Sequence, residues 1–162
     1  MTIVPLTRDH YQSVTGIYQE GIETGNATFE TSAPDWETWD KAHLSHSRIV
    51  ALVDGQVAGW AALSPVSGRC VYGGVAEVSV YIGKAFRGRG TGTTLLLELI
   101  KLSEQNGLWT LQAGIFPENA SSIKIHERSG FRRIGFREKV GQLAGKWRDT
   151  VQFERRSKVV GL

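Results

Sequence analysis

A glycine-rich turn between two regular segments constrains this chain more than any other feature. Before the turn, residues 76–82 alternate apolar and polar side chains, as in a strand with one buried face. After it, leucines recur at helical spacing over residues 91–106, and Gly107 ends the helix. The helix thus begins among glycines, where its first N–H groups have no internal partners and can face an anion. We expect this turn to hold a diphosphate through Arg87, Gly88, Arg89, Gly90, Thr91, Gly92 and Thr93.

Two common phosphate-binding motifs do not match the turn. A Walker loop requires Lys after its last glycine, where this chain has Thr93. A Rossmann fingerprint requires Gly or Ala at that position and an acid about 20 residues later, but residues 110–113 are all uncharged. A Rossmann-like sheet for a nicotinamide dinucleotide stays as the alternative fold. An ordinary surface turn with two arginines stays as the alternative role.

The remaining patterns predict a mixed α/β (α+β) fold in a single domain, residues 1–162. Asp54-Gly55 between two β-rich runs is the signal for a type I′ hairpin. Ser32 and Asp35 resemble a capping box for a helix over about residues 34–45. Strands are expected over residues 2–6, 48–53, 56–63, 76–82, 110–115, 131–140 and 147–154, and further helices after Asp9 and over residues 91–106 and 119–129.

Composition limits the partners and the location. The 162 residues contain 19 Lys and Arg against 16 Asp and Glu, and the net charge of +3 suits a polyanionic small molecule but is too small to argue for nucleic acid. No apolar stretch approaches the roughly 18 residues of a membrane span, so no membrane partner is expected. Cys70 is the only cysteine, which fits a reducing compartment, and we expect the cytoplasm. His43 and His46 have no third ligand nearby, so no metal is expected.

Two motifs in order resemble the GNAT superfamily of N-acetyltransferases. The first is Arg87-x-x-Gly90-x-Gly92, which is similar to the acetyl-CoA signature of that superfamily. The second is Asn119-x-x-Ser122-x-x-Ile125-His126 followed by Gly130-Phe131. Within the superfamily the chain looks most like the phosphinothricin and methionine sulfoximine N-acetyltransferases, through Ile17-Tyr18, Ala27-Thr28-Phe29-Glu30, Glu77-x-Ser79-Val80-Tyr81-Ile82, Ile123-x-Ile125-His126-Glu127 and Lys146-Trp147-Arg148-Asp149.

This resemblance implies a fold and a reaction. The fold would be a mixed, mostly antiparallel sheet of about seven strands flanked by about four helices, opened between the strands at residues 76–82 and 110–115. The reaction would move acetyl from acetyl-CoA to the α-amino group of phosphinothricin, methionine sulfoximine or methionine sulfone, by direct attack in a ternary complex, in a homodimer. The alternatives are another amine, such as a protein N-terminus, a polyamine or an aminoglycoside, or a non-catalytic CoA-binding module.

The resemblance also assigns residues to acetyl-CoA. Backbone groups of Val80, Tyr81 and Ile82 would pair with the pantetheine arm like an added strand, and one of their N–H groups would face the thioester oxygen. Asn119 would hydrogen-bond the same arm, and Ser122 would lie close to its sulfur end.

Glu77 and His126 are the expected catalytic residues. An α-amino group has a pKa of about 8 and is mostly protonated at neutral pH, so Glu77 would act as its general base, directly or through water. The alternative for Glu77 is a solvated strand glutamate. His126 stands where many superfamily members have a tyrosine that protonates the leaving thiolate, and its alternative is a packed helix histidine.

Arg69, Phe29 and Tyr72 are the expected acceptor-binding residues. A guanidinium fork suits a carboxylate, so Arg69 would bind that group, with Phe29 and Tyr72 as walls around the acceptor's side chain. A plain surface arginine is the alternative for Arg69. The Trp147-Arg148-Asp149 segment would form a dimer contact near the pocket or pack in the core.

Overall fold

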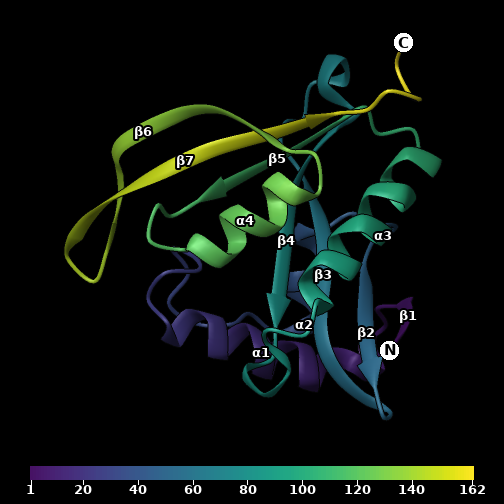
Figure 1. Cartoon of the computed structure of the whole chain (residues 1–162), viewed down its shortest axis with the longest axis vertical. Coiled ribbons are helices and arrows are strands. Elements are labelled where there is room, and N and C mark those ends of the chain that lie inside the picture. Colours follow the sequence, from purple (N-terminus) through teal and green to yellow (C-terminus); the bar gives the residue numbers. More distant parts are fainter.

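The computed structural model describes all 162 residues and places seven strands in one sheet of order β1-β2-β3-β4-β5-β7-β6 (Figure 1). The strands are β1 (Thr2–Pro5), β2 (Ile49–Val53), β3 (Gln56–Pro65), β4 (Val75–Ile82), β5 (Thr110–Ile115), β6 (Arg132–Leu143) and β7 (Lys146–Arg156). The helices are α1 (Tyr11–Glu23), α2 (Trp36–Ala42), α3 (Thr91–Gln105) and α4 (Ala120–Arg128), with single 3₁₀ turns at Arg8–His10, Cys70–Tyr72 and Lys84–Phe86. Only β4 and β5 are parallel neighbours, so the predicted mixed, mostly antiparallel sheet is confirmed.

Helices cover both faces of the sheet, and strand β3 shows why. Its side chains alternate, so Ala61 and Leu63 join the leucines of α3 in the larger core. Trp60 and Ala62 point the other way and join the side chains of α1 and α2 in a second core. None of the helices combines the length and the apolar character needed to cross a membrane.

Strands β4 and β5 separate partway along their length. They pair at only three positions, the last of which joins Glu77 to Gln112. Beyond that point β4 continues to Ile82 and keeps its pairing with β3 on the other side. The β4 edge over residues 78–82 is therefore free of β5, as expected from the resemblance.

The predicted start of α2 is wrong. The helix is capped by Asp35, whose carboxylate accepts a hydrogen bond from the Thr38 N–H at 2.8 Å, and Ser32 lies outside it. A contact with α1 explains the later start, because the Tyr11 hydroxyl donates to the Pro34 carbonyl at 2.6 Å. This contact holds the segment before Asp35 in a non-helical path.

The last two strands form a longer hairpin than predicted, and it projects beyond the rest of the sheet (Figure 1). The turn consists of Ala144 and Gly145, with φ of 50° and 77°. Two positive φ angles are typical of a type I′ turn, but Ala in such a turn gives no sequence signal. The predicted type I′ turn at Asp54 and Gly55 is confirmed, with φ of 49° and 77°.

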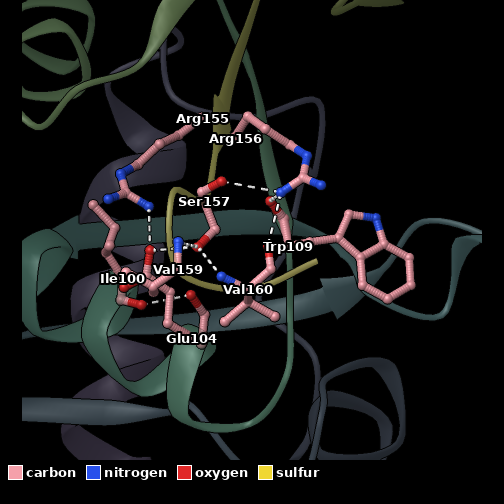
Figure 2. A network of polar contacts seen from close by, with 9 residues as sticks. Ile100, Glu104, Trp109, Arg155, Arg156, Ser157, Val159 and Val160 are labelled. Carbon is pink, nitrogen blue, oxygen red and sulfur yellow. Dashed lines mark hydrogen bonds and ion pairs between the residues drawn. The ribbon is translucent and has the colours of Figure 1, made fainter. Parts of the chain in front are cut away.

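A polar network fixes the C-terminal end of β7 against α3 (Figure 2). The Arg155 guanidinium and the Ser157 hydroxyl both donate to the Glu104 carboxylate at 2.9 Å. The Arg156 guanidinium donates to the carbonyl of Trp109, just before β5, at 3.3 Å. The network thereby holds the ends of α3, β5 and β7 together, away from the opening between β4 and β5.

Candidate active site

The opening between β4 and β5 has a carboxylate at its vertex. Glu77 lies opposite Ser64 of β3 and Gln112 of β5, at the last paired position before the two strands diverge. Strand alternation puts its side chain on the same face as Tyr81, which packs on the α1 side of the sheet. The neighbouring Val78 and Val80 face α3 instead.

The electrostatic environment of Glu77 suits a proton acceptor. The Glu77 residue as a whole is exposed to solvent. Protein atoms around its carboxyl group nevertheless exclude part of the water, and this desolvation raises the pKa of the carboxyl. The Arg137 guanidinium on β6 opposes this shift, and no ion pair joins the two groups. The carboxylate is thus more basic than that of a free glutamate.

The glycine-rich turn exposes backbone N–H groups at the start of α3. Gly88 and Gly90 adopt left-handed conformations, with φ of 75° and 80°, and no side chain caps the helix at Gly90. Gly88, Arg89 and Gly90 are exposed, whereas Thr91 and Gly92 are buried. An added Cβ at Gly92 would lie 2.9 Å from the Cδ1 of Ile125, so the start of α3 packs closely against α4.

Two arginines accompany these N–H groups. The Arg87 Nε donates to the Ile82 carbonyl at the end of β4, at 3.3 Å. The Arg89 guanidinium lies 5.9 Å from the Phe86 ring centroid, and neither arginine forms an ion pair. Free N–H groups and unpaired guanidinium groups together fit a diphosphate.

Helix α4 begins at Asn119, where the side chain acts as its cap. The Asn119 Oδ1 accepts from the Ser122 N–H at 3.3 Å, which leaves the Asn119 amide NH₂ available as a donor. The Ser122 hydroxyl lies 3.4 Å from the His126 Nδ1. These groups remain the predicted contacts of the pantetheine arm.

His126 is packed inside the protein. Its side chain is only 4% exposed, the Nδ1 lies 2.8 Å from the Ser122 carbonyl, and the ring meets Phe131 edge-on at 5.0 Å. Burial lowers the pKa of the imidazole. The Ser122 carbonyl beside Nδ1 can accept a hydrogen bond only from the tautomer with a proton on that nitrogen. This arrangement fits the packed helix histidine, and the general-acid role stays a prediction.

The predicted acceptor residues divide into two groups, one at each end of the paired strands. Arg69 and Tyr72 precede β4 and contact each other, with the guanidinium 5.6 Å from the ring centroid. Phe29 meets Phe116, which follows β5, edge-on at 4.8 Å. Because β4 and β5 are parallel, these groups lie at opposite ends of the pair, and Glu77 lies between them.

An open pocket of about 370 Å³ adjoins Glu77 and includes residues that sequence reasoning missed. It is lined by Val66, Ser67, Tyr72, Val75, Thr110 and Gln112. The alternation in residues 110–115 could have marked Gln112 as polar-facing, but its place beside Glu77 depends on the strand register. No sequence signal indicated Arg137, which reaches the site from a distant hairpin. A larger pocket of about 530 Å³ lies between the start of α1 and the β2–β3 turn, away from this site.

His43 and His46, the two histidines considered as metal ligands, each contact a neighbouring side chain. The His43 ring stacks on Trp39 at 4.1 Å, and the His46 Nδ1 lies 2.8 Å from the Ser47 hydroxyl. No three His, Cys, Asp or Glu side chains are grouped closely enough to hold a metal ion.

Comparison with known proteins assigns the family. The model of the Acetyltransferase (GNAT) family matches residues 13–131, which is most of the chain. The chain belongs to this family. The predicted superfamily and the predicted enzyme class, an acetyltransferase, are thus confirmed.

This GNAT acetyltransferase has similar relatives in several bacteria. It is 39% identical over 145 residues to the L-methionine sulfoximine/L-methionine sulfone acetyltransferase of Pseudomonas aeruginosa, covering 84% of this chain and 83% of that protein. Its fold matches the phosphinothricin acetyltransferase of Sinorhizobium meliloti, solved with acetyl-CoA, with a TM-score of 0.90 and 28% identity, over 99% and 90% of the two chains. It also matches the ribosomal-protein-alanine N-acetyltransferase of Brucella melitensis, with a TM-score of 0.89 and 29% identity, over 97% and 100% of the two chains.

Proposed function

We propose that this GNAT acetyltransferase moves acetyl from acetyl-CoA to the α-amino group of a small amino-acid-like acceptor. The proposed acceptors are methionine sulfoximine, methionine sulfone and phosphinothricin, the compounds named for the relatives. The observation that carries the proposal is the place of Glu77 at the vertex of the opening between β4 and β5. A carboxylate there is within reach of an amine that meets a thioester lying in the opening.

The residues of the chain fit acetyl-CoA at two places. The N–H groups at the start of α3, with Arg87 and Arg89, would bind its pyrophosphate. The β4 edge at Val80, Tyr81 and Ile82 would pair with the pantetheine arm, because β5 has already left that edge.

The chain's own residues would supply the proton transfer. Bound acetyl-CoA brings the thioester carbonyl that the amine attacks. Glu77 takes the proton of the ammonium group, which frees the nitrogen lone pair for attack. A backbone N–H of the β4 edge would donate to the carbonyl oxygen as negative charge develops there. The departing thiolate needs a proton, for which His126 is the proposed donor.

Charge in the site favours an anionic acceptor. Arg69 and Arg137 form no ion pairs, so both guanidinium groups are available to a carboxylate. The same cations would repel a polyamine or an aminoglycoside. A protein N-terminus is the second candidate acceptor, because a ribosomal-protein-alanine N-acetyltransferase shares the fold at 29% identity.

A screen of acceptors tests the proposal. Release of coenzyme A is measured with methionine sulfoximine, methionine sulfone and phosphinothricin, and with spermidine and a peptide with N-terminal alanine as comparators. We expect the highest kcat/KM among the first three compounds. A higher kcat/KM for the peptide or for spermidine would overturn the proposed acceptor class.

We further propose a homodimer located in the cytoplasm. Four apolar side chains on the projecting β6–β7 hairpin are about half exposed, namely Ile134, Phe136, Val140 and Trp147. Such a group is typical of a surface that binds another protein. Light scattering of the wild type and of Trp147→Ser tests this, and a monomeric wild type would contradict it. A reducing compartment suits the exposed, free Cys70.

A further inference from the structure

Arg148 on β7 connects the strand with two loops that border the active site. Its Nη1 donates to the Gly25 carbonyl at 2.7 Å, and its Nη2 donates to the Asn26 Oδ1 at 2.8 Å. The Nη2 also lies 3.3 Å from the Glu118 carboxylate. The Arg148 side chain is only 15% exposed, so its contacts with Gly25 and Asn26 are partly buried, whereas Glu118 is 57% exposed. The guanidinium is therefore held by both loops at once.

The Gly25 carbonyl is a good acceptor for this cation. It follows the last turn of α1, where Gly25 has a φ of 72° and its N–H bonds to the Ile22 carbonyl. A hydrogen bond from a guanidinium to a carbonyl oxygen is charge-assisted and therefore stronger than one between neutral groups. Arg148 thereby fixes the point at which the chain leaves α1 and enters the loop that carries Phe29.

The guanidinium also stacks on an aromatic ring that supports Phe29. It lies 4.2 Å from the centroid of Phe116, which is 4% exposed. Phe116 in turn meets Phe29 edge-on at 4.8 Å. Strand β6 also lies close to the Phe29 ring, because a Cβ added at Gly141 would lie 3.0 Å from it. Phe29 thus packs near both Gly141 and the Arg148–Phe116 stack.

We propose that Arg148 is a positioning residue that fixes Phe29 for acceptor binding. The inference rests on the proposed function and on the expectation from the sequence that Phe29 forms a wall of the acceptor site. Arginine suits this task because one planar group both donates in two directions and stacks on a ring. Lysine keeps the charge but cannot do both, so it should not restore the position of Phe29.

Steady-state kinetics of Arg148→Met and Arg148→Lys test the proposal with the acceptor that the wild type acetylates best. Loss of a group that donates in two directions and stacks on Phe116 should raise the acceptor KM about tenfold in both variants. The KM for acetyl-CoA should rise less than the acceptor KM, because Asn119 is the one predicted acetyl-CoA contact in the segments that the substitutions loosen and the start of α3 is not involved. Unchanged acceptor KM values in the folded variants would overturn the proposal.

A double-mutant cycle with Phe29→Ala shows whether Arg148 acts through Phe29. If it does, Arg148→Met adds almost nothing to the acceptor KM once Phe29 has been truncated. If the two KM effects multiply, Arg148 does not act through Phe29 and the proposal fails. Arg155→Met is the matched control, because Arg155 is also on β7, is 23% exposed and pairs with Glu104 (Figure 2). Arg155 lies opposite Leu111 near the start of β5, whereas Phe116 follows the end of that strand. The Arg155 substitution should lower the melting temperature and leave the acceptor KM unchanged.

Hydrogen exchange gives a readout that is independent of activity. Arg148→Met should speed exchange in residues 24–30 and 116–119, whereas Arg155→Met should not. If the exchange of both segments is unchanged, the proposal fails even where KM has risen. A wild type that acetylates no small acceptor contradicts the proposed function, while faster exchange in the two segments would still support the positioning role. The two failures are thus distinguishable.

Discussion

Substitution of Glu77 by glutamine tests the proposed chemistry most directly. The side chain forms no ion pair, so the isosteric amide breaks no salt bridge in the protein. Its effect should therefore fall on proton transfer. At pH 7 an amine with a pKa of about 8 is only about one-tenth neutral. A positioned general base contributes typically about 10²- to 10⁴-fold, so kcat at pH 7 should fall about 100-fold, or about 2.7 kcal/mol.

The pH dependence gives the sign of the effect. The base works only when ionised, so wild-type kcat/KM falls as the pH drops through the pKa of Glu77. Because partial burial raises that pKa, the fall begins at higher pH than for a free glutamate. Glu77→Gln lacks this acid limb. The ratio of wild-type to variant kcat/KM should shrink by up to about tenfold between pH 7 and pH 9, because the amine loses its own proton over that range.

The assay is coenzyme A release, with product confirmed by mass spectrometry because the exposed Cys70 thiol reacts with thiol reagents. The KM for acetyl-CoA should stay within about twofold, since the turn at the start of α3 is untouched. Glu98→Gln is the matched control, because Glu98 lies on α3 beside Lys101. A kcat for Glu77→Gln within about threefold of the wild type at pH 7 would refute the general-base role.

Three further changes probe the surroundings and the fold. Arg137→Gln removes the cation that opposes the raised pKa of Glu77, so the acid limb of kcat/KM should move to higher pH, and an unmoved limb would contradict their coupling. Gly90→Ala meets no atom within 4 Å but must adopt a φ of 80°, a conformation that costs about 1–2 kcal/mol for an L-residue. Asparagine adopts this conformation more readily than alanine. The acetyl-CoA KM of Gly90→Ala should therefore exceed that of Gly90→Asn, and equal KM values would count against the diphosphate role of the turn. Leu99→Ala leaves a cavity at a fully buried position of α3 and should lower the free energy of unfolding, measured with urea, by about 2–5 kcal/mol. A loss below about 1 kcal/mol would show that the core closes around the cavity.

The parts of the fold that the sequence predicts are those with local causes. The alternation around Glu77 and the positive φ angles of Asp54 and Gly55 depend only on neighbouring residues, and the structure has them where the patterns indicate. The start of α2 depends instead on a contact between Tyr11 and Pro34, which are far apart in the sequence. Two equally good capping residues precede that helix, so local preference alone cannot choose between them.

The parts of the site that the sequence missed come from pairing between distant strands. Gln112 reaches Glu77 through the register of β4 and β5. Arg137 comes from a hairpin whose register breaks between Arg137 and Gly141, where Lys139 has a φ of 47°. Such a bulge turns side chains out of the regular alternation, so a pattern of period two cannot indicate where Arg137 points.

Strand β4 can serve both substrates because a strand offers two faces and an edge. Ala76 and Val78 bury one face against α3, and Glu77 and Tyr81 present the other. The edge over residues 78–82 is open to a bound strand-like arm because β5 has left it. A slip of one residue would exchange the two faces, moving Glu77 into the apolar core and two apolar side chains into the site. In the proposed reaction, the register that buries the core would therefore also set where the acceptor nitrogen meets the thioester.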